Sequence, residues 1–156
     1  MRRKDREITD KEKIRQIVES CYCCRIGFCD EGQVYIVPLN FGYVIRQEQY
    51  TFYFHSAKEG RKIDLIQKNP HVGIELDTGG QLIVSDLACG CSTRYQSIIA
   101  NGILHMVTDP AEKEAGLLSI LEHTTGKRDW HFDHAMLQAV NVFKADITNL
   151  SCKEHE

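Results

Sequence analysis

The chain consists mostly of short strand-like segments separated by turn residues, and this pattern restricts the fold more than any other feature. The clearest segment is QYTFYFH, residues 49–55, in which large aromatic side chains alternate as they do on the two faces of a strand. Polar turns at residues 30–33 and 78–80 join neighbouring segments as hairpins. Strand-like segments outnumber helical ones, and the strand–helix alternation of a doubly wound sheet is missing. We therefore predict a mainly β fold, an antiparallel barrel with peripheral helices.

Turn and cap residues set the expected limits of the elements. Capping boxes, in which Ser or Thr precedes Glu by three residues, begin the first two helices at Thr9 and Ser56, and Pro110 opens the third. Pro38 lacks a backbone donor and predicts an edge strand or a bulge, and Gly102 predicts a bulge. No linker divides the chain, so residues 1–156 are predicted to form a single domain. Helices are expected at about 10–21, 56–69 and 110–122, and strands at about 25–29, 34–41, 49–55, 71–77, 81–87, 95–107 and 140–150.

Composition excludes several classes of protein. The 156 residues are 42% hydrophobic, and no apolar run is long enough to span a membrane. The basic start, MRRKDREITDKEK, is not followed by an apolar stretch, so we expect no secretory signal and a cytoplasmic location. The net charge is -3 with both signs interspersed, unlike the basic surface of a nucleic-acid binder. We expect neither a nucleic acid nor a membrane as partner.

The chain has seven cysteines, an odd number that argues against a disulfide framework in the absence of a signal peptide. Cys21 and Cys24 form a C-x-x-C pair that Cys89 and Cys91 could complete as a tetrahedral metal site. However, C-G-C is not a zinc-knuckle spacing, and the first pair leads into a strand-like run. We predict no metal site, and buried or incidental thiols instead.

The segment HSAKEGRK, residues 55–62, breaks a local rule. It joins a strand to a helix N-terminus, where free N–H groups and the helix dipole favour anions. Yet Lys58, Arg61 and Lys62 lie there against a single acid, Glu59. A bound phosphate would reconcile these features, and Gly60 would let the backbone approach it closely. The alternative is a solvated basic turn with no ligand.

A second segment, SDLACGCSTRYQS at residues 85–97, is rich in small and hydroxyl-bearing residues. Such groups suit a polar, phosphorylated or heterocyclic ligand, and they equally suit an ordinary loop. The candidate binding residues in this segment are Ser92, Thr93, Arg94, Tyr95 and Ser97.

At these two segments the sequence resembles the flavin-binding split barrels related to pyridoxamine 5'-phosphate oxidase, and within them most closely the nitroimidazole-resistance branch. The similarity runs through the chain in order: MRRKDREI at the start, VPLNFGY at 37–43, YFHSAKEGRK at 53–62, NPHVGIEL at 69–76 and RYQSIIANGILHMVTDPAEKEAGLL at 94–118.

The resemblance implies a six-stranded antiparallel split barrel that forms a homodimer, with FMN or FAD in each of two clefts between subunits. Residues Ser92–Ser97 would close each cleft. FMN and FAD present the same phosphate, so the sequence does not choose between them. The implied flavin contacts are Pro38, Leu39, Asn40 and Phe41 along the isoalloxazine ring and ribityl chain, His55, Ser56 and Ala57 beside the phosphate, Gly60 at the close approach, and Arg61 and Lys62 as charge partners.

The implied activity is that of a flavin-dependent oxidoreductase, which passes electrons from NAD(P)H to a small acceptor such as a nitroaromatic. The C-terminal substrate-binding segment of true pyridoxamine-phosphate oxidases is not found, which argues against vitamin B6 oxidation. The flavin would supply most of the chemistry, and no catalytic side chain is predicted.

The histidines leave alternatives open. The other reading of the fold is a non-catalytic flavin- or haem-binding module, with His55, His105 or His131 as an axial haem ligand. His123, His131 and His134 could also line the substrate side of a flavin, or simply belong to a polar loop.

Overall fold

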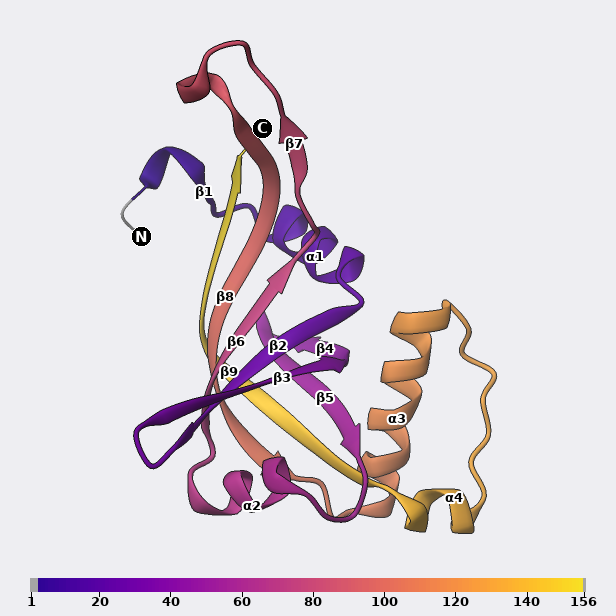
Figure 1. The fold of residues 1–156 in the computed structure, drawn as a ribbon. Coiled ribbons are helices and arrows are strands. Elements are labelled where there is room, and N and C mark those ends of the chain that lie inside the picture. The colour runs from indigo at the N-terminus through magenta and orange to yellow at the C-terminus, as the bar shows by residue number, and fades with distance from the viewer. Residues whose placement is uncertain (1–2, 156) are drawn as a thin grey trace.

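The computed structural model describes residues 3–155, and within them nine strands form one antiparallel sheet. Its hydrogen-bonded order is β3-β2-β6-β8-β9-β5-β4, while β1 pairs with β9 and β7 with β8 (Figure 1). The strands are β1 (Glu7–Ile8), β2 (Cys23–Asp30), β3 (Gln33–Asn40), β4 (Gly42–Arg46), β5 (Gln49–Ser56), β6 (His71–Asp77), β7 (Gln81–Ile83), β8 (Ser92–Met106) and β9 (Asn141–His155). The helices are η1 (Lys4–Arg6), α1 (Lys11–Ser20), α2 (Arg61–Lys68), η2 (Ala88–Gly90), α3 (Pro110–Thr125) and α4 (His134–Ala139).

The sheet curls into a barrel that is not closed by hydrogen bonds. Its two edge strands, β3 and β4, follow one another in the chain with only Phe41 between them. The mainly β, split-barrel prediction is confirmed, and Pro38 lies on an edge strand as predicted. The path contains seven strands rather than six, because Gly42–Arg46 forms a separate strand that no turn residue announces.

The core fills the barrel with aromatic and branched side chains. Phe52 and Phe54 on β5 are fully buried, as their alternation predicts. Phe54 stacks on Phe143 of β9 with ring centroids 5.2 Å apart. Helix α3 lies so close to β4 that a Cβ atom at Gly42 would overlap the backbone at Ile120. Glycine is therefore required where the helix crosses this edge strand.

The helix limits test the cap predictions. Helix α3 agrees with them: Asp109 Oδ2 accepts from Glu112 N at 2.8 Å, and Gly126 ends the helix at φ 71°. The capping box at Ser56 is wrong, because Ser56 is the last residue of β5 and its Oγ donates to the Ala57 carbonyl. Likewise, Asp10 rather than Thr9 caps α1.

Strand β8 is fifteen residues long, and its length changes one predicted pairing. Its middle residues, 97–103, pair with β6, and its first three pair with β7, with Ile83 opposite Ser92. The predicted hairpin between 71–77 and 81–87 is therefore wrong. Residues 81–95, here called the arm, project from the barrel beside the end of β9 (Figure 1). The bulge predicted at Gly102 is confirmed by a register shift at that point.

Candidate functional site

The N-terminus of α2 has free backbone donors. Gly60 lies at φ 139°, a conformation that side chains other than glycine's rarely adopt, and it provides no side-chain cap. The Gly60 carbonyl accepts from the N–H groups of Ile63 and Asp64. The N–H groups of Arg61 and Lys62 therefore have no partner within the helix and are available to an anion.

Arg61 and Lys62, the two predicted phosphate partners, are in different situations. The Arg61 guanidinium donates to Asp30 of β2 at 2.8 Å and lies 4.3 Å from the centre of the Tyr35 ring. Lys62 is half-buried and makes no ion pair with any residue between 3 and 155. Of the two cations in the first turn of α2, Lys62 is thus the one whose charge is not already matched, and Lys58 in the loop before it also makes no ion pair among residues 3–155.

At the end of β5, before α2, some groups already have hydrogen-bond partners within the chain. His55 is exposed on β5, whereas Ser56 is buried and bonded to the Ala57 carbonyl. The Asn141 side chain donates to the Lys58 carbonyl at 2.9 Å and so holds the loop that leads to Gly60. Of these residues, the structure leaves the side chain of His55 accessible to a ligand.

Residues 38–41 lie at an open edge of the barrel. Strand β3 pairs only with β2, so its other edge has free backbone groups, except at Pro38. Pro38 and Asn40 are exposed, Leu39 is half-buried, and Phe41 is in the core. The exposed edge can offer alternating donors and acceptors to the rim of a heterocycle.

The second predicted segment is not near the first within one chain. Ser92 begins β8, whereas Ile103, eleven residues later, lies opposite His71 just after α2. At about 3.3 Å per residue these ends of β8 are roughly 36 Å apart. Figure 1 shows β7 and the start of β8 at the opposite end of the molecule from α2. One chain alone therefore does not bring Ser92–Ser97 to the α2 site.

Two residues of this segment line a hollow of their own. Arg94 and Tyr95 border a pocket of about 530 Å³ together with Gln96, Glu154 and His155. Nδ1 of His155 donates to the Thr93 carbonyl at 2.9 Å and lies 3.3 Å from Ser92 Oγ. The hydroxyl and basic groups of the segment thus gather along the arm.

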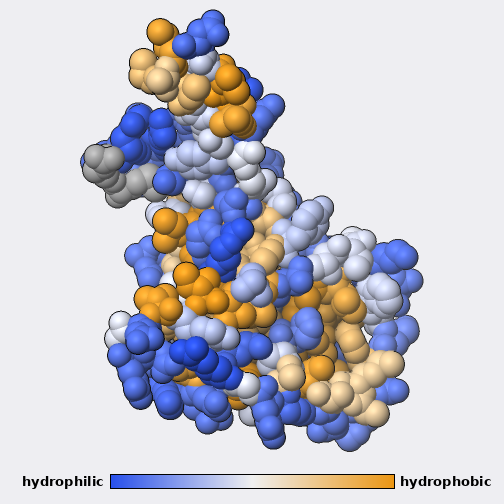
Figure 2. Space-filling view, in the orientation of Figure 1, coloured by the Kyte–Doolittle hydropathy of each residue, from blue (hydrophilic) through white to orange (hydrophobic). Residues whose placement is uncertain are grey.

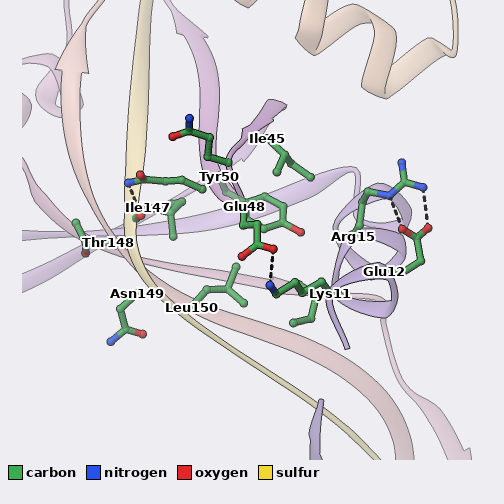
Figure 3. Close-up of a pocket in the computed structure, with 13 residues that line it drawn as sticks. Lys11, Glu12, Arg15, Ile45, Glu48, Tyr50, Ile147, Thr148, Asn149 and Leu150 are labelled. Carbon is green, nitrogen blue, oxygen red and sulfur yellow. Dashed lines mark hydrogen bonds and ion pairs between the residues drawn. The ribbon is translucent and has the colours of Figure 1, made fainter. Parts of the chain in front are cut away.

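A further cavity, of about 680 Å³, lies where α1, the β4–β5 turn and β9 meet (Figure 3). Its lining mixes apolar side chains, among them Ile45, Ile147 and Leu150, with polar and charged ones, and Lys11 and Glu48 on it form an ion pair. None of the predicted flavin residues lines it. No sequence motif marks this cavity, because three elements far apart in the chain create it.

The sequence profile of a family described as pyridoxamine 5'-phosphate oxidase matches residues 10–154, which is most of the chain. The chain belongs to this family. Among curated protein sequences, none matches it. The resemblance on which the fold prediction rested is confirmed.

Solved structures extend the comparison. A candidate 5-nitroimidazole antibiotic resistance protein from Bacteroides thetaiotaomicron is 32% identical, with a TM-score of 0.82 over 95% of this chain and 86% of that one. The flavocytochrome Anf3 from Azotobacter vinelandii is 18% identical, with a TM-score of 0.80 over 100% and 72% of the two chains. An FAD- and haem-binding protein from Mycobacterium smegmatis is 15% identical, with a TM-score of 0.82 over 97% and 74%. The structures from Azotobacter vinelandii and Mycobacterium smegmatis show only that they share the fold of this oxidase-family chain.

The histidines of this oxidase-family chain have separate surroundings. His131 and His134 are exposed around the start of α4. Nε2 of His105 lies 3.6 Å from Oδ2 of Asp146. His123 instead packs between helices and strands, and both its ring nitrogens face backbone carbonyls. Within residues 3–155, no three His, Cys, Asp or Glu side chains lie close enough together to hold a metal ion.

The cysteines divide into buried and exposed groups. Burial raises the pKa of the Cys21 and Cys152 thiols to about 11, and it also raises the pKa of Cys24. The C-G-C cysteines are exposed on η2, so the four thiols considered as metal ligands are not together.

We expect a thiol reagent to separate these groups, because the reactive species is the exposed thiolate. Iodoacetamide at pH 8 should label Cys29, Cys89 and Cys91 in the native protein, and Cys21, Cys24 and Cys152 only after denaturation. Peptide mass spectrometry of native and unfolded samples measures the labelling. Rapid native labelling of Cys24, the most deeply buried thiol, would contradict the packing described here.

Proposed function

We propose that this protein is a flavin-binding oxidoreductase, which holds FMN or FAD and passes electrons from NAD(P)H to a small acceptor such as a nitroaromatic. The observation that carries the proposal is the start of α2, where free N–H groups and the unmatched charge of Lys62 converge. The exposed edge of β3 in the same chain suits the ring of a flavin. The predicted cofactor agrees with relatives described as a flavocytochrome and as an FAD- and haem-binding protein.

Each part of this site would have a binding task. The Lys62 ammonium and the α2 N–H groups would hold the phosphate, with Gly60 leaving room for it. The backbone of residues 38–40 would orient the ring through its polar rim. The bound flavin supplies the hydride and electron chemistry. The protein's contribution is binding and orientation, and no side chain is assigned a proton-transfer role.

We also propose a homodimer with the flavin between subunits. Ser92 lies roughly 36 Å, and Ser97 about 20 Å, along β8 from Ile103 near α2, so a second copy would have to provide Ser92–Ser97 to close the site. Apolar side chains are exposed where a partner would cover them: Leu82, Val84 and Leu87 on the arm are 70%, 77% and 69% exposed (Figure 2).

The outer face of β3 offers a second apolar contact. Ile36 is 61% exposed and lies opposite Gly27, which in turn lies opposite Gly73. Without side chains at these two glycines, the face is flat enough for another sheet or chain to approach.

Replacing Ile36 by Asp should convert the dimer to monomer at micromolar concentration, because a charge would be buried in the contact. Sedimentation velocity measures this, with FMN affinity measured in parallel. Met136→Asp, at an exposed apolar position on α4, is the matched control and should remain dimeric. A wild-type protein that binds FMN as a stable monomer would contradict the dimer.

The function is tested by the cofactor and then by turnover. Purified protein should carry flavin absorbance near about 370 and 450 nm, and mass spectrometry of the released cofactor separates FMN from FAD. NAD(P)H oxidation is then followed with and without a nitroaromatic acceptor. Protein that binds neither flavin would overturn the proposal. A flavin that NAD(P)H does not reduce, or a Soret band, would favour the non-catalytic or haem-binding alternative.

None of the helices in residues 3–155 has the length and apolar character needed to cross a membrane. A cytoplasmic location, where NAD(P)H is available, remains part of the proposal.

A further inference from the structure

The ring nitrogens of His123, in the last turn of α3, face two carbonyl groups from other parts of the chain. Its Nδ1 lies 2.7 Å from the Phe41 carbonyl oxygen and its Nε2 lies 3.3 Å from the Glu19 carbonyl oxygen. A carbonyl oxygen only accepts, so the short contact requires a hydrogen on Nδ1. The imidazole therefore donates to the backbone at Phe41.

Both carbonyls need a donor from outside their own element. Glu19 is the second-last residue of α1, and the last four carbonyls of a helix have no partner within it. Phe41 lies between β3 and β4 and belongs to neither strand ladder. His123 therefore donates to the Phe41 carbonyl where the strand ladders are interrupted, and its Nε2 faces the Glu19 carbonyl at the end of α1.

The ring is also held by packing. The His123 ring meets Phe41 and Tyr43 edge-on, with centroids 4.6 Å and 5.2 Å apart. The Tyr43 hydroxyl donates to Glu19 Oε1 at 2.9 Å. The cluster joins α1, α3 and the seam of the open barrel, by which we mean the unpaired boundary between β3 and β4 around Phe41. The imidazole cannot move without disturbing all three.

The seam makes this contact important for ligand binding. No ladder joins β3 to β4, so the end of β3 is held by its bonds to β2 and by whatever fixes Phe41. The Phe41 side chain is buried against Phe52, with centroids 5.1 Å apart, and His123 holds its carbonyl. These two contacts fix the Phe41 end of the segment, while the ladder to β2 and the bond from the Asn40 side chain to the Tyr22 carbonyl hold residues 38–40 from the other side.

We infer that His123 is a positioning residue for the flavin: by holding the Phe41 carbonyl, it sets the place of the β3 end along which the isoalloxazine ring binds. This inference rests on the proposed function. His123 does not touch the ring itself, because its nitrogens are occupied by the two carbonyls and its edges by aromatic neighbours.

Replacing His123 by Phe keeps an aromatic ring in the cluster and removes the Nδ1 donor to the Phe41 carbonyl. A hydrogen bond contributes about 0.5–1.5 kcal/mol net, so FMN affinity should fall by about 3- to 10-fold. The absorbance band of bound FMN near about 450 nm should also shift, because the polar groups along the ring move. His123→Gln, which keeps an amide donor, should restore most of the affinity and the wild-type band.

The matched control is Tyr43→Phe, which removes the bond to the Glu19 side chain and leaves the Phe41 carbonyl held. It should lower stability without changing FMN affinity or the band. Titration of apo-protein with FMN and absorbance spectra measure both readouts. Equal effects of Tyr43→Phe and His123→Phe would overturn the inference, as would unchanged binding in His123→Phe.

A separate measurement does not depend on any variant folding. In the wild-type protein, ¹⁵N NMR of the histidine rings should show a proton on Nδ1 of His123. An unprotonated Nδ1 would overturn the inference. Wild-type protein that binds no flavin would instead overturn the proposed function, so the two failures are distinguishable.

Discussion

Replacing Lys62 by Ala is expected to weaken FMN binding by roughly 10- to 150-fold, since a hydrogen bond to a charged group contributes about 1.5–3 kcal/mol. Lys62 lies in the first turn of α2 and has no ion-pair partner among residues 3–155, so the charge of its ammonium group is available to the phosphate. Arg61 already pairs with Asp30, and Arg61→Ala would change that contact as well as any contact with ligand. Lys62 gives the cleaner test.

The empty protein should lose little stability in this variant, because a cation in the first turn of a helix opposes the helix dipole. Thermal protection by excess FMN should fall, following the loss of affinity. Lys68→Ala, an exposed lysine at the other end of α2, is the control and should bind FMN as wild type does. Equal dissociation constants for Lys62→Ala and wild type would place the phosphate elsewhere and favour the solvated basic turn.

Local sequence signals predicted the fold well where one element alone decides the outcome. Helix α3 begins at Pro110 and stops at Gly126 because both residues act through their own backbone geometry. The cap at Ser56 failed because a tertiary contact decides it: Ser56 lies opposite Asn141 in a strand ladder, and β5 continues through it. The helix then starts five residues later.

Pairing between strands was harder to predict than the strands themselves. The turn at residues 78–80 suggests that the strands on either side of it pair with each other. Instead, β8 is long enough to pair with β6 through residues 97–103 and with β7 through its first three residues. Sequence alternation gives the faces of a strand, whereas the partner depends on which neighbours reach the same edge.

For the candidate site, too, the sequence showed what one segment decides and missed what depends on contacts between distant segments. Charges that oppose a helix dipole marked residues 55–62 as a candidate anion site from the sequence alone, although the helix itself begins at Arg61 rather than Ser56. That Arg61 is matched by Asp30, thirty-one positions away, could not be read from the segment. Nor could the contact between His123 and Phe41, which depends on α3 packing against the barrel seam. Charge patterns reveal where a ligand could bind, and only the fold shows which charges are already paired.

Replacing Phe54 by Ala is expected to lower the free energy of unfolding by about 3–5 kcal/mol, the usual cost of truncating a buried aromatic residue. Phe54 is fully buried and stacks on Phe143, so its removal leaves a cavity between β5 and β9. A domain of this size has about 5–15 kcal/mol of stability in total, so a large share would be lost. Urea unfolding followed by circular dichroism measures the change.

The control for this variant is Tyr22→Ala, because Tyr22 is also aromatic but is 63% exposed. Its free energy of unfolding should stay within about 0.5 kcal/mol of wild type, as is usual for surface positions. The comparison separates burial from the chemistry of an aromatic ring. Similar losses in both variants, or a loss below about 1 kcal/mol in Phe54→Ala, would show that β5 does not place Phe54 in the core. That result would also move His55, the next residue along the strand, from the exposed face on which the site depends.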